Sequence, residues 1–166
     1  MTGRAGRAWL FGDGIDTDVM APGRYFKEPQ EVMARHCMEA IDPRFADAIR
    51  PGDVIVAGRN FGIGSAREQA PMALRHLGIG AILAQSYGRI FYRNALSFGI
   101  PALIFPHAAR IGAGDELRVD PVGGLVDNLT TGSHYRVAGL PGHLVSMVAA
   151  GGLMPWLKQR IARGEM

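Results

Sequence analysis

Cysteine is nearly absent from the sequence, which has Cys37 as its single thiol among 166 residues. One thiol excludes an internal disulfide, so we expect either a reducing compartment or indifference to redox conditions. No apolar run approaches the roughly 20 residues that a membrane-spanning helix needs. The basic N-terminal stretch has too few apolar residues for a signal peptide. These absences predict a soluble, cytoplasmic chain that does not contact membranes.

Lysine is also scarce, and occurs only at positions 27 and 158, although the net charge is +3. The positive charge is therefore almost all arginine. The arginines are scattered, without a basic run or an interleaved set of aromatic residues, which argues against a nucleic-acid-binding protein. Hydrophobic residues make up 48% of the chain, enough for a sizeable core. The length predicts one domain, residues 1–166.

The apolar pattern predicts an α/β fold with a mixed sheet. Its centre is a βαβ unit, which implies parallel strands joined by right-handed crossovers. After Pro106 the pattern changes to short strands separated by turns, which favours antiparallel pairing. The expected strands are 7–11, 53–57, 81–84, 102–105, 116–119, 125–126 and 134–137, and helical patterns cover 32–41, 60–77, 90–98 and 144–161.

The stretch Gly58–Ala70 follows a buried strand and leads into a helical pattern. Gly62 and Gly64 allow a sharp turn and a close approach to the main chain. We expect Ser65 at the start of the helix, where free amides and Arg67 would favour an anion. The same residues fit a capping box, S-x-x-E, in which Ser65 and Glu68 only satisfy helix-end amides. Both interpretations follow from the residues.

Other glycine-rich loops fit this stretch poorly. A dinucleotide fingerprint would need a third glycine where Arg67 stands, and no Gly-Lys-Ser/Thr follows for a phosphate loop. The hydrolase motif G-x-S-x-G is not met. Upstream, three carboxylates lie at Asp13, Asp16 and Asp18, but without the calcium-loop spacing. Turn chemistry is the simpler interpretation for Asp13 and Asp16.

Several separated motifs together resemble those of a known family. The decapeptide FGIGSAREQA at 61–70, with DGIDTD at 13–18 upstream, is similar to the isopropylmalate isomerase small subunits, the swivel-domain members of the aconitase family. The likeness continues through 25–26, 36–39, 86–94 and 99–101, and it covers roughly residues 8–106. It implies the swivelling β/β/α domain of that family.

The resemblance implies a reaction and roles for particular residues. The family dehydrates and rehydrates hydroxy di- and tricarboxylates. By position, Ser65 matches the base that moves a proton, and Asp18 matches an active-site acid that pairs with a histidine of a larger partner. Arg67, flanked by Gly64 and Ala66, matches the group that binds a substrate carboxylate. An unperturbed serine hydroxyl is a very weak base, so neighbouring charges must assist it.

The family's chemistry uses a [4Fe–4S] cluster, which needs several cysteine thiolates. Cys37 alone cannot supply them, so we expect no cofactor on this chain and the cluster on a separate large subunit. The resemblance thus implies a heterodimer or heterotetramer with an iron–sulfur partner. Without such a partner, the same loop would be a carboxylate-binding module. A serine hydrolase using Ser65 is a third possibility.

Two departures and one loop bear on the substrate. The family that the chain resembles usually has serine where this chain has Ala66, and often histidine where it has Gln69. By resemblance, the loop 24–28 lies beside the variable group of the substrate. Tyr25 and Phe26 suit a branched alkyl group, whereas Lys27 suits an additional carboxylate, as in homoaconitase substrates. Two aromatic residues favour an alkylmalate, with isopropylmalate first.

Overall fold

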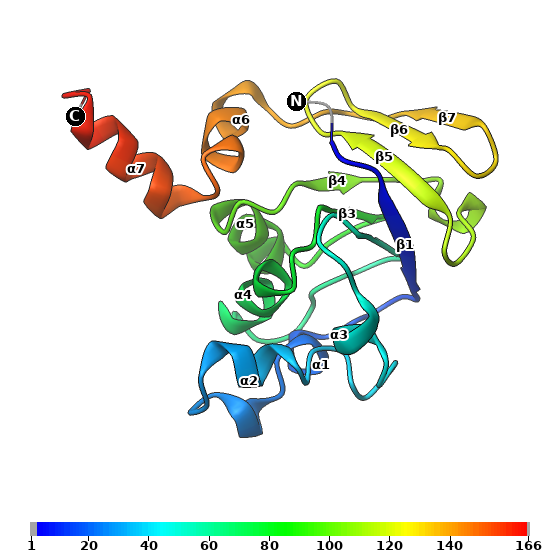
Figure 1. Cartoon of the computed structure of the whole chain (residues 1–166), viewed down its shortest axis with the longest axis horizontal. Helices are drawn as coiled ribbons and strands as arrows, with labels where there is room; N and C mark the ends of the chain where they lie inside the picture. Colours follow the sequence, from blue (N-terminus) through cyan, green and yellow to red (C-terminus); the bar gives the residue numbers. More distant parts are fainter. Residues whose placement is uncertain (1–2, 166) are drawn as a thin grey trace.

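The computed structural model describes residues 3–165, and its centre is a seven-stranded mixed sheet (Figure 1). The strand order is β4-β3-β2-β1-β5-β6-β7. The first four strands in this order are parallel to one another, and β5 to β7 join antiparallel. The strands are β1 (Gly6–Phe11), β2 (Val54–Ala57), β3 (Ala81–Ala84), β4 (Ala102–Ile104), β5 (Glu116–Asp120), β6 (Leu125–Asn128) and β7 (Ser133–Arg136). The predicted mixed α/β sheet is confirmed.

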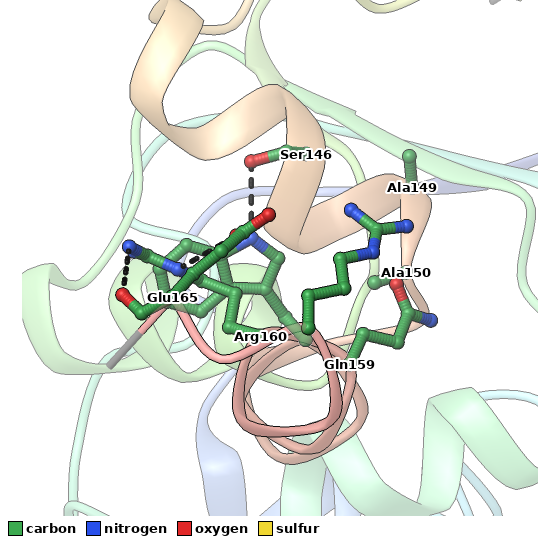
Figure 2. A pocket seen from close by; sticks show the side chains of 8 residues that line it. Ser146, Ala149, Ala150, Gln159, Arg160 and Glu165 are labelled. Atoms are coloured by element: carbon green, nitrogen blue, oxygen red, sulfur yellow. Dashed lines mark hydrogen bonds and ion pairs between the residues drawn. The ribbon is translucent and has the colours of Figure 1, made fainter.

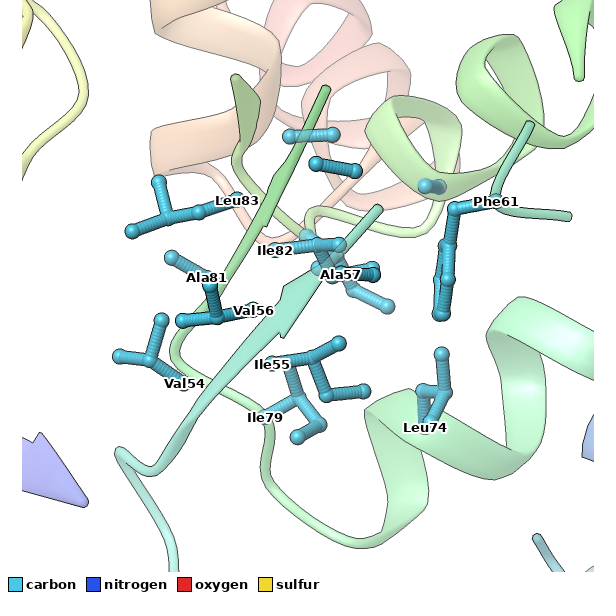
Figure 3. Packing of buried hydrophobic residues seen from close by; sticks show 14 of the residues in the cluster. Val54, Ile55, Val56, Ala57, Phe61, Leu74, Ile79, Ala81, Ile82 and Leu83 are labelled. Atoms are coloured by element: carbon cyan, nitrogen blue, oxygen red, sulfur yellow. The ribbon is translucent and has the colours of Figure 1, made fainter. Parts of the chain in front are cut away.

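The core lies on both faces of the parallel strands. Every residue of β2 and β3 is buried, as expected for strands covered on both sides. Figure 3 shows Val54 and Leu83 on one face of these strands, and Ile55 on the other, directed at Leu74. The sheet is curled: the Phe105 ring, just beyond β4, packs edge-on against a ring on β7, that of Tyr135, at 5.4 Å. The two outermost strands therefore come near one another.

Helices pack beside the parallel strands and at one end of the sheet. The helix α4 lies between α5 and the N-terminal helices α1 and α2, and α6 and α7 follow α5 toward the C-terminus (Figure 1). The structure contains α1 (Thr17–Met20), a 3₁₀ turn η1 (Gly23–Tyr25), α2 (Gln30–Ala34), α3 (Phe45–Ala48), α4 (Gln69–His76), α5 (Arg89–Ser97), a 3₁₀ turn η2 (Ala108–Arg110), α6 (Gly142–Ala149) and α7 (Leu153–Ala162). None of the helices in residues 3–165 combines the length and apolar character needed to cross a bilayer.

Two helix predictions need correction. The pattern at 32–41 is not one helix, because α2 ends at Ala34 and the chain continues in turns. After Ala34 the hydrogen bonds become those of single turns, such as His36 N–H to Met33 O at 3.1 Å, and the positive φ of 62° at Met38, whose N–H bonds to Val19 O, excludes a continuing helix. The terminal pattern is two helices, divided at Gly151 and Gly152, which have φ of 92° and 121°. Apolar periodicity alone does not reveal such breaks.

Candidate functional site

Three loops meet where the parallel strands β1, β2 and β3 end. The loop after β2 is hydrogen-bonded to the loops after β1 and β3. Gly62 N–H donates to Ile15 O at 2.7 Å, and Phe61 N–H donates to Ser86 O at 3.0 Å. Thr17 N–H donates in turn to Ile63 O at 2.9 Å. The three loops thus continue the order of the sheet beyond its carboxyl edge, which is where open α/β sheets place their ligands.

Glycines allow this close contact between the loops. Gly62 and Gly64 have φ of 80° and 97°, as the predicted sharp turn requires. A Cβ on Gly62 would lie 2.2 Å from the Phe91 ring, and one on Gly64 would lie 2.6 Å from the Asp16 carboxylate. Asp16 accepts from Asp18 N–H at 2.7 Å, which caps α1 and confirms its role in holding the loop.

Ser65 does not begin a helix, so both the capping-box interpretation and the expected position beside the α4 dipole were wrong. The helix starts at Gln69, after Glu68 in the cap position, with no side-chain cap bond. The reason is tertiary: the buried hydroxyl of Thr17 donates to Ser65 O at 2.9 Å and holds Ser65 in the loop. Ser65 is exposed, and within residues 3–165 its hydroxyl makes no hydrogen bond.

The Ser65 loop lines a hollow of about 530 Å³ together with the start of α5. Its walls include the exposed side chains of Arg89, Ile90 and Arg93. Neither arginine has an ion-pair partner within the described residues. Sequence reasoning assigned no role to these residues. The sequence did contain a signal for them, because the two arginines are four residues apart at the start of a helical pattern. That pattern follows β3, the strand next to β2, and loops that follow adjacent parallel strands lie close together.

Arg67 joins two of the other candidate residues. Its Nη1 lies 2.7 Å from Asp18 Oδ1, and its guanidinium lies 4.8 Å from the centre of the Phe26 ring. A quarter of the Arg67 side chain is exposed, compared with 56% of the Asp18 side chain. Arg67 Nη1 also donates to Ala21 O at 3.5 Å. The guanidinium is therefore held by charge, by a ring face and by a carbonyl, and it keeps other N–H groups for a ligand.

The other candidates are arranged differently. Ala66 is exposed between Ser65 and Arg67. Tyr25 stacks on His36, with ring centres 3.7 Å apart and planes 9° from parallel. Lys27 is exposed, and it forms no ion pair within the described part of the chain. Phe26 is thus the aromatic residue of this loop that contacts the candidate site.

The residues present do not fit an iron–sulfur cluster. Cys37 is fully buried, and burial raises the pKa of its thiol, which disfavours the thiolate that a metal requires. Across residues 3–165, no three side chains of His, Cys, Asp or Glu come together as metal ligands. The described residues therefore offer no set of ligands that fits such a group.

A second hollow, of about 550 Å³, lies between α6 and α7 (Figure 2). Figure 2 shows Ser146 and Arg160 on its walls. Trp156 Nε1 donates to Ser146 Oγ at 3.1 Å, and the Arg160 guanidinium lies 4.9 Å from the Trp156 ring centre. None of the predicted site residues lines this hollow. This hollow is therefore separate from the candidate residues expected from the sequence.

The chain is similar to proteins of one family. A family model described as the aconitase C-terminal domain matches residues 17–108, which include the loops after β2 and β3 and begin at α1, just after the loop that follows β1. A 3-isopropylmalate dehydratase small subunit from Moorella thermoacetica is 47% identical and covers 94% of this chain and 95% of its own. A methanogen homoaconitase small subunit from Methanothermobacter thermautotrophicus is 48% identical, covering 90% of this chain and 87% of its own.

A solved structure extends the likeness to three dimensions. The crystal structure of a 3-isopropylmalate dehydratase from Methanocaldococcus jannaschii has a TM-score of 0.90 at 39% identity, covering 97% of this chain and 96% of that one. The likeness therefore includes the antiparallel strands and C-terminal helices as well as the matched segment. The chain belongs to the aconitase family, among the 3-isopropylmalate dehydratase small subunits.

Proposed function

We propose that the chain is the small subunit of a cytoplasmic 3-isopropylmalate dehydratase, a hydro-lyase that is active only with its large subunit. The observation that carries this proposal is the Ser65 hydroxyl, exposed in an arginine-lined hollow and without a hydrogen bond in the described chain. In this proposal, the hydroxyl and the guanidinium of Arg67, two residues along the same loop, form half of a catalytic centre. The family and the small-subunit names of relatives support the partner.

In the proposed mechanism, Arg67 binds a substrate carboxylate and Ser65 moves the proton on the carbon next to the hydroxyl-bearing carbon. A free serine is far too weak a base, so positive charge must favour its alkoxide form. The structure suggests Arg89, Arg93 and the N-terminal end of α5, which line the same hollow, as the source. This replaces the N-terminus of α4, which begins four residues beyond Ser65.

The remaining assignments are proposals for the assembled enzyme. Asp18 retains an exposed carboxylate oxygen for a partner histidine while it pairs with Arg67. Gly64 and Ala66 present the backbone beside the substrate. Because this chain does not fit a cluster, we place the [4Fe–4S] group on the large subunit, and we treat residues 1–166 as one swivel domain.

Homoaconitase is the second candidate, because one relative at 48% identity has that name. Its substrate carries an additional carboxylate, for which Lys27 is the available cation in the substrate loop. Lys27 is exposed and unpaired within residues 3–165, whereas Phe26 lies against Arg67. This arrangement favours an alkyl group and supports isopropylmalate as the substrate.

The test is a hydration assay with purified chain, alone and reconstituted with an iron–sulfur large subunit. We expect turnover of isopropylmalate only in the complex, and no iron on the isolated chain. Turnover by the chain alone, or stoichiometric iron on it, would contradict the two-subunit proposal. Hydrolysis of simple esters by the isolated chain would instead support a serine hydrolase.

A further inference from the structure

Four side chains form a closed ring of contacts that links the loop carrying Phe26 to residues 36–39. Arg24 and His36 both bond to Glu39: the Arg24 guanidinium donates to one carboxylate oxygen, and His36 Nδ1 lies 2.6 Å from the other. The Tyr25 ring lies between them, stacked on His36 at 3.7 Å and beneath the Arg24 guanidinium at 4.8 Å. We call Arg24, Tyr25, His36 and Glu39 the loop clamp.

One side of the loop clamp is fixed to the core. Met38, between His36 and Glu39, is fully buried, and its N–H donates to Val19 O at 3.0 Å. Its φ of 62° is costly for a residue with a side chain, and such a conformation persists only where the surroundings enforce it. Cys37, which precedes Met38, is also fully buried. His36 and Glu39 therefore stand on a rigid base that is bonded to the helix containing Asp18.

The other side of the clamp, Arg24 and Tyr25, belongs to a short turn with few hydrogen bonds. Arg24 and Phe26 are exposed and belong to the 3₁₀ turn η1 and its cap, which is held by single-turn hydrogen bonds only. So short a segment has little stability of its own. Without the clamp, the contact between Phe26 and Arg67 would be the main side-chain contact to hold the loop beside the site.

We propose that Glu39 is a positioning residue for substrate selection: through Arg24 and His36 it holds residues 24–28 in place, so that Phe26 stays on Arg67. The proposal rests on the proposed function, because it assumes that Phe26 meets the substrate. It also gives Tyr25 a role other than lining the pocket. Tyr25 is the packed centre of the clamp, and its ring is shared between a cation and an imidazole.

The arrangement predicts a loss of preorganisation when Glu39 is removed. When the loop is ordered for only part of the time, the apparent dissociation constant of the substrate rises in inverse proportion to the ordered fraction. A single exposed ion pair has little effect on stability, but Glu39 connects two partners and through them a stacked ring. We therefore expect a change in KM that exceeds any change in kcat.

The experiment compares Glu39→Gln with Asp127→Asn, a matched control. Asp127 also bonds a histidine, His134, at 2.8 Å, but it does so on the antiparallel strands β6 and β7. Hydrogen–deuterium exchange on the isolated chain reports the clamp without a partner or substrate. The amides of Tyr25, Phe26 and Glu28 donate within the loop, so they report its opening. We expect at least about threefold faster exchange in Glu39→Gln and no change in the control.

The second measurement uses the reconstituted enzyme. We expect KM for isopropylmalate to rise about three- to tenfold in Glu39→Gln with kcat within about twofold, and no change in the control. Arg24→Gln, at a side chain that is 67% exposed, should give the same result if Glu39→Gln does not fold, and the two changes should not be additive. Unchanged exchange would overturn the clamp itself. Faster exchange with unchanged KM would overturn its link to substrate selection, and with it the proposed role of Phe26.

Discussion

Arg67 Nη1 lies 2.7 Å from Asp18 Oδ1 and thereby joins the loop after β2 to the short helix after β1. The same guanidinium covers the Phe26 ring. Charge alone does not explain this arrangement, because an ammonium could pair with Asp18 equally well. Only a planar guanidinium can pair with a carboxylate, lie flat on a ring and still offer a fork to a second carboxylate.

Arg67→Lys should therefore impair the assembled enzyme although it keeps the charge. We expect about tenfold weaker binding of a dicarboxylate substrate analogue, because a lysine loses the bidentate geometry and the contact with Phe26. Competitive inhibition of the reconstituted enzyme measures this affinity. Arg118→Lys on the exposed side of β5 is the control and should have no effect. If Arg67→Lys bound the analogue as tightly as Arg118→Lys, Arg67 would have no role in substrate binding.

Ser65→Ala should separate chemistry from stability. Because Ser65 caps no helix, we expect the free energy of unfolding to change by less than about 0.5 kcal/mol, while turnover by the reconstituted enzyme is abolished. Asp16→Ala is the contrast, since it removes the cap of α1 and should cost about 1 kcal/mol. Urea titration of the unmodified chain and both variants measures the free energy of unfolding, and the hydration assay on the reconstituted enzyme measures turnover. A Ser65→Ala variant that unfolds as easily as Asp16→Ala, or turns over normally, would refute the assignment.

The strands could be predicted from the sequence because their signals are local. Gly99, with φ of 77°, follows the helix before β4, and a glycine at such a position is a local stop signal. Helix starts were less predictable where distant groups compete for the backbone. The motif at Ser65 satisfies the capping box in its letters, but a hydroxyl from Thr17 holds it elsewhere. No pattern within the motif reports a hydrogen bond to a residue so far upstream.

In the candidate site, too, local sequence signals could be interpreted, whereas contacts between distant residues could not be predicted. The resemblance identified the loop, and the structure brings Arg67, Asp18 and Phe26 together. The resemblance could not indicate that Tyr25 stacks on His36. That contact depends on the buried Met38, whose backbone has a left-handed conformation. Arg89 and Arg93 were missed because their proximity to Ser65 depends on two parallel strands being adjacent. Side-chain direction in loops is decided by such tertiary contacts.

The environment of Asp53 indicates how the stability of the fold depends on pH. This carboxylate is 3% exposed, and it accepts from Trp9 Nε1 and from the backbone N–H groups of Arg7 and Arg50. Burial raises the pKa of Asp53, but the hydrogen bonds and the nearby Arg7 guanidinium outweigh it and hold the pKa below its ordinary value. A depressed pKa stabilises the fold above the ordinary value of about 3.9, and this stabilisation is lost as the pH falls through the folded-state pKa.

Asp53→Asn should therefore lower stability at neutral pH by about 2–4 kcal/mol, because the amide cannot accept all of these hydrogen bonds. It should also flatten the dependence of stability on pH below about 4. Urea unfolding at pH 7 and at pH 3 measures both effects. Asp120→Asn is the control, since Asp120 only accepts from the N–H groups of the exposed turn that follows it. Equal losses at both pH values would contradict the role of the Asp53 charge.

Lys27 determines which substrate the enzyme prefers if its charge reaches the site. Exposed and without an ion pair in residues 3–165, Lys27 is free to stay in water and leave room for an alkyl group beside Phe26. We therefore expect Lys27→Ala to keep kcat/KM for isopropylmalate within about twofold, with homoaconitate and citrate remaining poor substrates. Apolar pockets discriminate by only about 1–3 kcal/mol per methylene, whereas an unpaired buried charge is penalised more heavily. A preference of the unmodified enzyme for tricarboxylates, abolished by Lys27→Ala, would show that Lys27 swings inward and that homoaconitase is the correct assignment.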